Sequence, residues 1–190
     1  MRIKSKYLSN PKSENHLAID TRKWFAIYTK FRAEKYVVEQ IKRKGISAYL
    51  PLINKTKRYV RKVKHSQIPL INCYAFVFID QSEYIKVLET EYLLKFIKQG
   101  KNLISIPQIE IDLLERIVCA DILTIAETLK FTEGERVEII RGQLTGLKGK
   151  LIAQKNKNEF VVELINVGYQ LKLDINPAFL RPLQSSLLYT

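Results

Sequence analysis

The residues with the clearest capacity for chemistry are basic and lie close together. Residues 54–65 contain six lysines and arginines and no acidic residue. Like charges at this density repel one another unless a counter-charge neutralises them, so the run favours contact with phosphate groups. A solvated charged loop is the alternative, and charge alone cannot read a base sequence. The alternation over residues 58–64 fits either a basic hairpin or an exposed loop.

Residue types used in catalysis are scarce. The cysteines are Cys73 and Cys119, and the histidines are His16 and His65. They match no disulfide framework and no zinc-type spacing, and neither cysteine has a sequence neighbour that suggests a nucleophile–base pair. The acidic residues form no metal or acid–base motif. We therefore expect a protein that is not an enzyme and that uses no cofactor and no metal.

The overall charge indicates a polyanionic partner. The 190 residues carry a formal charge of +13, of which residues 23–120 hold +9 and residues 131–183 hold +2. Nucleic acid fits better than an anionic membrane, because no apolar run approaches the roughly 18 residues of a membrane span and no amphipathic anchor is evident. We expect a reduced, cytoplasmic, monomeric protein that binds no membrane.

The apolar periodicity of residues 23–120 predicts an α+β unit. Helices that gather on one face of a mainly antiparallel sheet give a sandwich related to the ferredoxin-like motif. Tyr74, Phe76 and Phe78 alternate onto one face of the sheet, so one face packs the helices and the other must be covered by something else. The predicted elements are strands 23–29, 46–51, 69–79 and 93–98, and helices 31–44, from 80 or 82 to about 88, and from 107 to about 118.

Residues 131–183 are predicted to form a small all-β barrel. Gly142, Gly146 and Gly149 indicate tight turns and bulges, because their spacing does not fit a dinucleotide-binding loop and no crossover helix follows. Short strands are expected around 137–139, 150–154, 160–165 and 169–173, with a hairpin turn at 155–158. Residues 1–22 are interpreted as a flexible basic tail, and residues 121–130 as a linker.

Two motifs resemble a known family. Trp24-Phe25-Ala26-Ile27-Tyr28 is similar to the opening strand of the N-terminal domain of NusG-type transcription elongation factors, and residues 69–77 (PLINCYAFV) resemble that family's PLFPGYVFV strand. The glycines of the second unit lie where a KOW motif has them. The resemblance implies a NusG N-terminal domain followed by an SH3-like KOW barrel. Ile71, Asn72 and Cys73 depart from the family's Phe, Pro and Gly, and the chain resembles the specialised paralogues RfaH and the UpxY-like antiterminators of capsular polysaccharide operons.

The resemblance implies a binding site for the clamp of RNA polymerase. In the family, the N-terminal domain binds this clamp through an apolar depression beside the sheet. A helix-in-groove contact of this kind needs aromatic anchors, and a role as ordinary core residues is the alternative. The matching positions are Tyr28, Ile71, Tyr74, Phe76 and Phe96.

The resemblance also implies contact with the non-template DNA strand or nascent RNA. Lysine and arginine position phosphates or read guanine, glutamine pairs with adenine, and an aromatic ring supports a splayed base. A solvated helix surface is the alternative. The matching positions near the first helix are Lys30, Tyr36, Gln40, Arg43 and Lys44, and the basic run adds Lys57, Arg58, Arg61 and Lys62.

The KOW barrel is implied to recruit a ribosomal protein or the termination factor Rho, with Phe160 and Ile165 as candidate exposed contacts. Its β-branched and aromatic strands predict a stable barrel. The expected function is transcription elongation or antitermination, for a polysaccharide biosynthesis operon. A housekeeping NusG or an RNA- or ribosome-binding KOW protein is the alternative.

Overall fold

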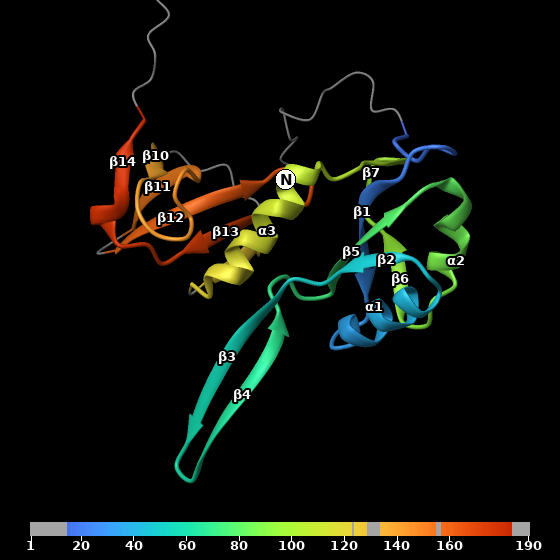
Figure 1. Cartoon of the computed structure of the whole chain (residues 1–190), viewed down its shortest axis with the longest axis horizontal. Coiled ribbons are helices and arrows are strands. Elements are labelled where there is room, and N and C mark those ends of the chain that lie inside the picture. Colours follow the sequence, from blue (N-terminus) through green and yellow to red (C-terminus); the bar gives the residue numbers. More distant parts are fainter. Residues whose placement is uncertain (1–14, 123, 129–133, 155–156, 184–190) are drawn as a thin grey trace, which may run out of the picture.

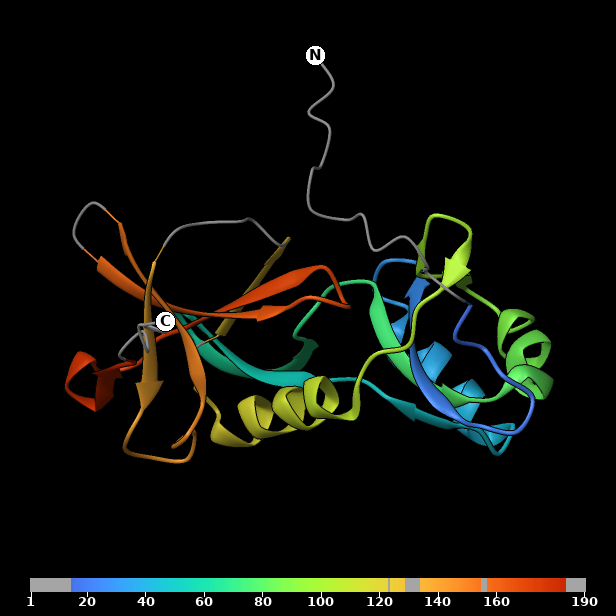
Figure 2. The ribbon, with the colours of Figure 1, turned by 90° about the horizontal axis from the view of Figure 1, so that it is seen from above.

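The computed structural model describes residues 15–122, 124–128, 134–154 and 157–183. These residues form two units that lie side by side, with helix α3 (Gln108–Ala120) between them (Figure 1, Figure 2). The predicted fold class is confirmed, because an α+β unit is followed by an all-β unit. None of the helices in the described residues is both long enough and apolar enough to cross a membrane.

The first unit is a four-stranded antiparallel sheet in the order β2-β5-β1-β6, with two helices on one face. Val37 and Ile41 of the first helix and Val87 of the second pack against this face and form a core of their own. Asp80 caps the short helical segment before α2, as its position in the sequence predicts. The bounds are β1 (Lys23–Thr29), α1 (Glu34–Arg43), β2 (Ser47–Tyr49), β5 (Tyr74–Ile79), η1 (Gln81–Glu83), α2 (Tyr84–Leu88) and β6 (Leu93–Phe96).

The basic run forms a hairpin rather than a loop. Strands β3 (Leu52–Tyr59) and β4 (Lys62–Pro69) form a two-stranded sheet, and Val60 and Arg61 make the turn between them. The hairpin projects away from both units (Figure 1). A smaller hairpin, β7 (Lys98–Gln99) and β8 (Asn102–Leu103), follows β6.

The second unit is a six-stranded antiparallel sheet in the order β14-β10-β11-β12-β13-β9. Its first strand was predicted as part of the linker 121–130, yet residues 124–128 pair with β13 along their whole length. The alternation Thr-Ile-Ala-Glu-Thr is compatible with a strand once a neighbouring strand supplies its hydrogen bonds. The bounds are β9 (Thr124–Thr128), β10 (Glu135–Ile139), β11 (Lys148–Gln154), β12 (Lys157–Leu164), β13 (Tyr169–Leu173), η2 (Pro177–Phe179) and β14 (Leu180–Pro182).

Two predicted segments differ in extent. The strand predicted over 69–79 begins only at Tyr74, because Cys73 adopts a left-handed conformation with φ 65° and turns the chain. The end of the predicted tail is attached to the first unit, since His16 donates its backbone N–H to Leu103 and Arg22 pairs with Glu83. The rest of that tail, residues 1–14, lies outside the described residues, as do positions 123, 129 and 130 of the predicted linker and 155–156 of the predicted turn.

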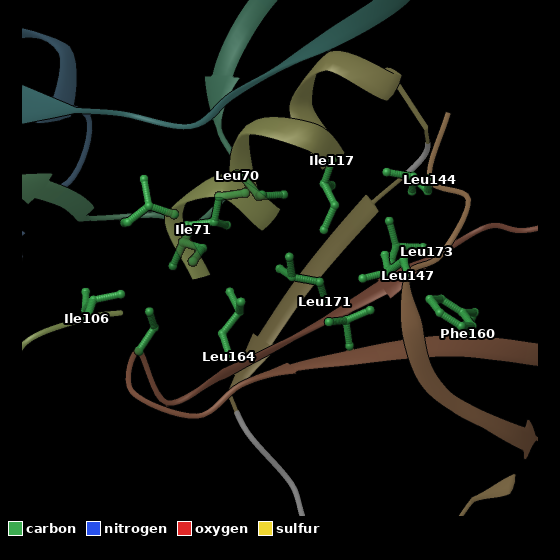
Figure 3. Packing of buried hydrophobic residues seen from close by; sticks show 14 of the residues in the cluster. Leu70, Ile71, Ile106, Ile117, Leu144, Leu147, Phe160, Leu164, Leu171 and Leu173 are labelled. Carbon is green, nitrogen blue, oxygen red and sulfur yellow. The ribbon is translucent and has the colours of Figure 1, made fainter. Parts of the chain in front are cut away.

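A second core joins the two units. The sheet face opposite α1 and α2 contributes Phe76, and the loop before β5 contributes Leu70 and Ile71. Figure 3 shows these loop residues in one core with Ile117 of α3 and with Leu171 of β13. The second face of the first sheet is therefore covered by α3 and by the second unit, as the strand alternation required.

Candidate functional site

The covered face brings together four of the five residues predicted to bind polymerase. Ile71 and Phe76 are buried there. The ring of Tyr28 meets the ring of Tyr74 edge to face with 5.4 Å between centroids, and Tyr74 meets Tyr169 of β13 at 5.1 Å. Three tyrosine rings thus form a continuous contact that begins on the first unit and ends on the second.

Phe96 lies apart from this set. It pairs with Ile27 across β1 and β6, and both side chains point into the core beneath the helices. Its ring stacks on Tyr84 with 4.7 Å between centroids. The structure therefore places Phe96 on the opposite face of the sheet, because cross-strand partners share a face.

Tyr49 belongs to the covered face, although the sequence analysis did not select it. Its ring stacks on Phe76 at 6.3 Å, and its hydroxyl is buried without a hydrogen-bond partner among the described residues. Burial raises the pKa of Tyr49, and Glu115 of α3 adds to the shift. Burial also raises the pKa of Tyr74 to about 12, with a further contribution from the neighbouring Tyr169. The sequence of the short strand 47–49, Ser-Ala-Tyr, does not indicate that Tyr49 lies on the covered face.

A polar contact also holds the second unit. Glu110 of α3 accepts hydrogen bonds through Oε1 from the side chain of Asn166 at 2.7 Å and from its backbone N–H at 3.3 Å. Its other oxygen, Oε2, is buried without a partner among the described residues. Burial raises the pKa of Glu110, and the bonds from Asn166 oppose that shift. The ionised carboxylate therefore costs free energy in this contact.

Glu110→Gln is expected to stabilise the contact between α3 and the second unit at neutral pH. The pKa of Glu110 is raised in the folded chain, so its protonated form stabilises the fold below its ordinary value of 4.5, and this contribution is lost as the pH rises through the raised pKa. Glutamine keeps the Oε1 acceptor and removes the charge. Thermal unfolding between pH 4.5 and 7 should show a decline for the wild type that the variant lacks. Glu89→Gln, on the exposed end of α2, is the control, and an unchanged decline in Glu110→Gln would contradict the prediction.

The predicted nucleic-acid residues at the start of α1 form an exposed aromatic cluster. The ring of Tyr36 lies 5.5 Å from that of Tyr92, and the ammonium of Lys30 lies 5.2 Å from the same ring. Tyr36 donates its hydroxyl hydrogen to Glu91 at 3.0 Å. Tyr92 was missed because it sits in a short polar turn without periodicity, and its φ of 65° turns the chain there.

Two of the remaining predicted nucleic-acid residues, Arg43 and Lys44, lie at the end of α1 and make different contacts. Arg43 is exposed and pairs with Glu39 one turn earlier at 2.5 Å. Lys44 instead donates to the backbone oxygen of Lys86 at 2.7 Å and to the Thr90 hydroxyl at 2.9 Å, so it joins α1 to the end of α2. Gln40 is half-buried. Both side chains are exposed, but Lys44 holds two elements of the first unit together, whereas Arg43 contacts only its own helix.

The hairpin cations do not share one face. Side chains alternate along a strand, so Lys57 of β3 and Lys62 of β4 lie on one face, while Arg58 lies on the other. Arg61 lies in the turn. On the second unit, Ile165 is exposed, but Phe160 is buried with its ring against the backbone of Gly149. The prediction that Phe160 is an exposed contact is therefore wrong, since its place on β12 points it into the core.

The comparisons with known proteins concern the family and the fold of the chain. Residues 22–115 match the family model described as "Transcription termination factor nusG". The structure described as "Domain interaction in Thermotoga maritima NusG" is similar with a TM-score of 0.54 and 16% identity, over 86% of this chain and 98% of that chain. At this identity the likeness shows the fold alone.

Two further comparisons add little. The structure described as "Crystal Structure of MjSpt4:Spt5 complex conformation B" has 17% identity over 85% of this chain and 97% of that chain, but its TM-score of 0.30 is too low to support an argument. No curated protein matches the sequence. Residues 22–115 are therefore similar to the NusG family, and the chain shares the fold of the Thermotoga maritima NusG structure.

Proposed function

We propose that the chain is a transcription elongation factor of the antiterminating kind, which binds the clamp of RNA polymerase through the first unit. The observation that carries the proposal is the aromatic face of Tyr28, Tyr74 and Phe76, which α3 and the second unit cover, whereas α1 and α2 pack on the other face of the sheet. If the second unit moves away, this face becomes exposed. It would then offer aromatic anchors of the kind that dominate protein interfaces.

The covering contact is suited to reversal. It leaves the hydroxyl of Tyr49 and one oxygen of Glu110 buried without partners among the described residues. Each such group costs about 1–3 kcal/mol in a buried site, and water would satisfy it after opening. These two unpaired polar groups therefore destabilise the closed arrangement. A competing partner needs less binding free energy to open it.

Exposed residues would make two further contacts, one with nucleic acid and one with a partner protein. Lys30, Tyr36 and Arg43 would meet the non-template DNA strand or nascent RNA beside the polymerase, together with cations of the hairpin. The second unit, once released, would recruit a ribosomal protein or Rho, with Ile165 as part of its contact surface. The chain would act by holding polymerase in a processive state, without making or breaking a bond, and would serve a polysaccharide biosynthesis operon.

The direct test is co-migration of the purified chain with core RNA polymerase or with ribosomal particles. Binding to polymerase, followed by increased read-through of terminators in transcription reactions, is the expected result. Binding to ribosomal particles alone would favour the second candidate, an RNA- or ribosome-binding KOW protein, for which the basic hairpin would also suffice. A housekeeping NusG role would instead give stimulation of termination with Rho.

Arg43→Ala is expected to weaken binding to a paused elongation complex about tenfold, which corresponds to about 1.4 kcal/mol. Binding to free polymerase should stay unchanged, because the side chain lies away from the aromatic face. Lys42→Ala removes the same charge from the adjacent exposed position and is the matched control. Titration of a labelled chain against both complexes measures the effect, and equal losses in the two titrations would argue against a nucleic-acid contact at Arg43.

A further inference from the structure

We infer that Glu34 is a positioning residue for the covered aromatic face. Its buried carboxylate holds the turn of residues 71–74 in a left-handed conformation, and this turn places Ile71 and Tyr74 against the second unit. The inference deepens the proposed function, on which it rests for the further step that the same face binds the clamp. Glu34 lies outside the set of residues that the sequence indicated.

Residues 71–74 form a tight turn with a left-handed residue at its third position. The backbone N–H of Tyr74 donates to the backbone oxygen of Ile71 at 3.3 Å, which closes the turn. Cys73 occupies the third position with φ 65°. Turns with a positive φ at this position favour glycine, because a residue with a Cβ atom is strained in the left-handed region. Such strain persists only where surrounding contacts hold the backbone in place.

Buried residues hold both backbone polar groups of Cys73. Its N–H donates to Oε1 of Glu34 at 2.8 Å, and Glu34 is only 3% exposed. Its carbonyl oxygen accepts the backbone N–H of Thr29 at 2.8 Å, and the Thr29 hydroxyl lies 3.4 Å from the same oxygen. The backbone bond from Thr29 extends the pairing of β1 with β5, whereas the bond to Glu34 depends on a single side chain. Loss of that side chain would leave a buried N–H without its acceptor.

The location of Glu34 suits a buried carboxylate that acts as an acceptor. Glu34 is the first residue of α1, where the helix dipole stabilises negative charge. It forms no ion pair with a residue that the structure describes. A hydrogen bond to an ionised acceptor is roughly twice as strong as one to a neutral acceptor. The carboxylate therefore holds the N–H of Cys73 more firmly than a neutral side chain would.

The two ends of the turn carry contacts of the covered face. Ile71 is buried in the core that the first unit shares with α3 and the second unit (Figure 3). The ring of Tyr74 meets the ring of Tyr169 with 5.1 Å between centroids. Both residues lie within two positions of Cys73, so a rotation of its peptide groups would move both side chains. Glu34 therefore acts on the covered face through the backbone of Cys73.

The first test measures how fast iodoacetamide labels the Cys73 thiol in the full-length chain. Cys119→Ser leaves Cys73 as the only cysteine, because the chain has two. Cys73 is buried, so its labelling reports opening of the turn. Glu34→Ala is expected to raise the labelling rate about tenfold, within the range for a buried donor that loses its acceptor. Glu34→Gln should stay within about threefold of the parent chain, because glutamine keeps an acceptor oxygen.

The pair of Glu34 substitutions separates the hydrogen bond from the charge. Both remove the same negative charge, so a direct effect of charge on the thiol would appear in both. Glu39→Ala removes an exposed carboxylate from the same helix and should leave the rate unchanged. Labelling of Glu34→Ala should depend little on urea at low concentration, because a local opening exposes little surface. An unchanged rate in Glu34→Ala, equal increases in both variants, or a steep dependence on urea would overturn the inference.

Affinity for polymerase provides the functional readout, measured in chains with Tyr169→Asp so that the second unit does not compete. Glu34→Ala should weaken binding about tenfold, and adding Cys73→Gly should restore most of it, because glycine adopts the left-handed conformation without strain. A loss that Cys73→Gly does not repair would show that Glu34 does not act through the turn. If the Tyr169→Asp chain itself bound no polymerase, the proposed function would fail, whereas the labelling result would still decide the role of Glu34.

Discussion

Tyr169→Asp is expected to increase the affinity of the chain for RNA polymerase about tenfold, whereas Tyr74→Asp is expected to abolish binding. The two rings lie 5.1 Å apart in the closed contact, so an aspartate at either position places a carboxylate in an apolar site and opens the two units. Opening raises the fraction of chains that can bind, and the apparent dissociation constant falls in proportion. Only Tyr74 lies on the face proposed to bind the clamp.

The opposite signs make this pair informative. Circular dichroism of each variant controls for folding, and Tyr74→Phe controls for loss of the hydroxyl alone. If Tyr169→Asp also lost polymerase binding while remaining folded, the second unit would be part of the binding surface rather than its cover. If Tyr74→Asp still bound, the covered face would not be the polymerase site.

Gly149→Ala is expected to destabilise the second unit by about 3 kcal/mol, the upper end of the usual costs of overpacking. A Cβ atom at this position would lie 2.6 Å from Cζ of Phe160 and 2.7 Å from the backbone oxygen of Val161. Neither neighbour can retreat easily, because Phe160 is buried and Val161 is held in the β11–β12 pairing. Denaturant unfolding followed by far-ultraviolet circular dichroism measures the loss.

Gly168→Ala separates this cause from backbone strain. Gly168 has φ 76° in the turn between β12 and β13, and a Cβ atom there would meet nothing within 4 Å. Only the left-handed backbone is penalised, by about 1–2 kcal/mol. A loss in Gly168→Ala as large as that in Gly149→Ala would show that the close approach of Phe160 is not the dominant cost.

The elements with strong periodicity were predictable from the sequence. The apolar run before Asp80, the stripe of Val37 and Ile41, and the glycines of the second unit each indicated the element that the structure contains. The alternation of Tyr74 and Phe76 even required a cover for the second sheet face. These features depend on local pattern and on burial, which one sequence records well.

The remaining features depend on contacts between distant residues. Strand β9 exists because β13 supplies its hydrogen bonds, so its own sequence resembled a linker. Phe96 was assigned to the polymerase face from the family resemblance. The sequence of its strand does not indicate which side chains face the helices. The contact of Tyr92 with Tyr36 arises from a turn in which Tyr92 itself is left-handed, and such turns have no periodic pattern. Cys73 has a left-handed backbone at the position where the family's strand motif has glycine. Because cysteine rarely adopts this conformation, the sequence did not indicate the turn.

The short connection between the two units sets the kinetics of the proposed opening. Helix α3 ends at Ala120 and β9 begins at Thr124, so the second unit remains tethered within a few residues of its site. A short tether gives an effective concentration in the millimolar range, on the order of that found for short flexible linkers. Under the proposed function, a polymerase at cellular concentration would therefore capture chains that have already opened. Its observed association rate should level off at the opening rate as polymerase concentration rises, and Tyr169→Asp should remove that plateau.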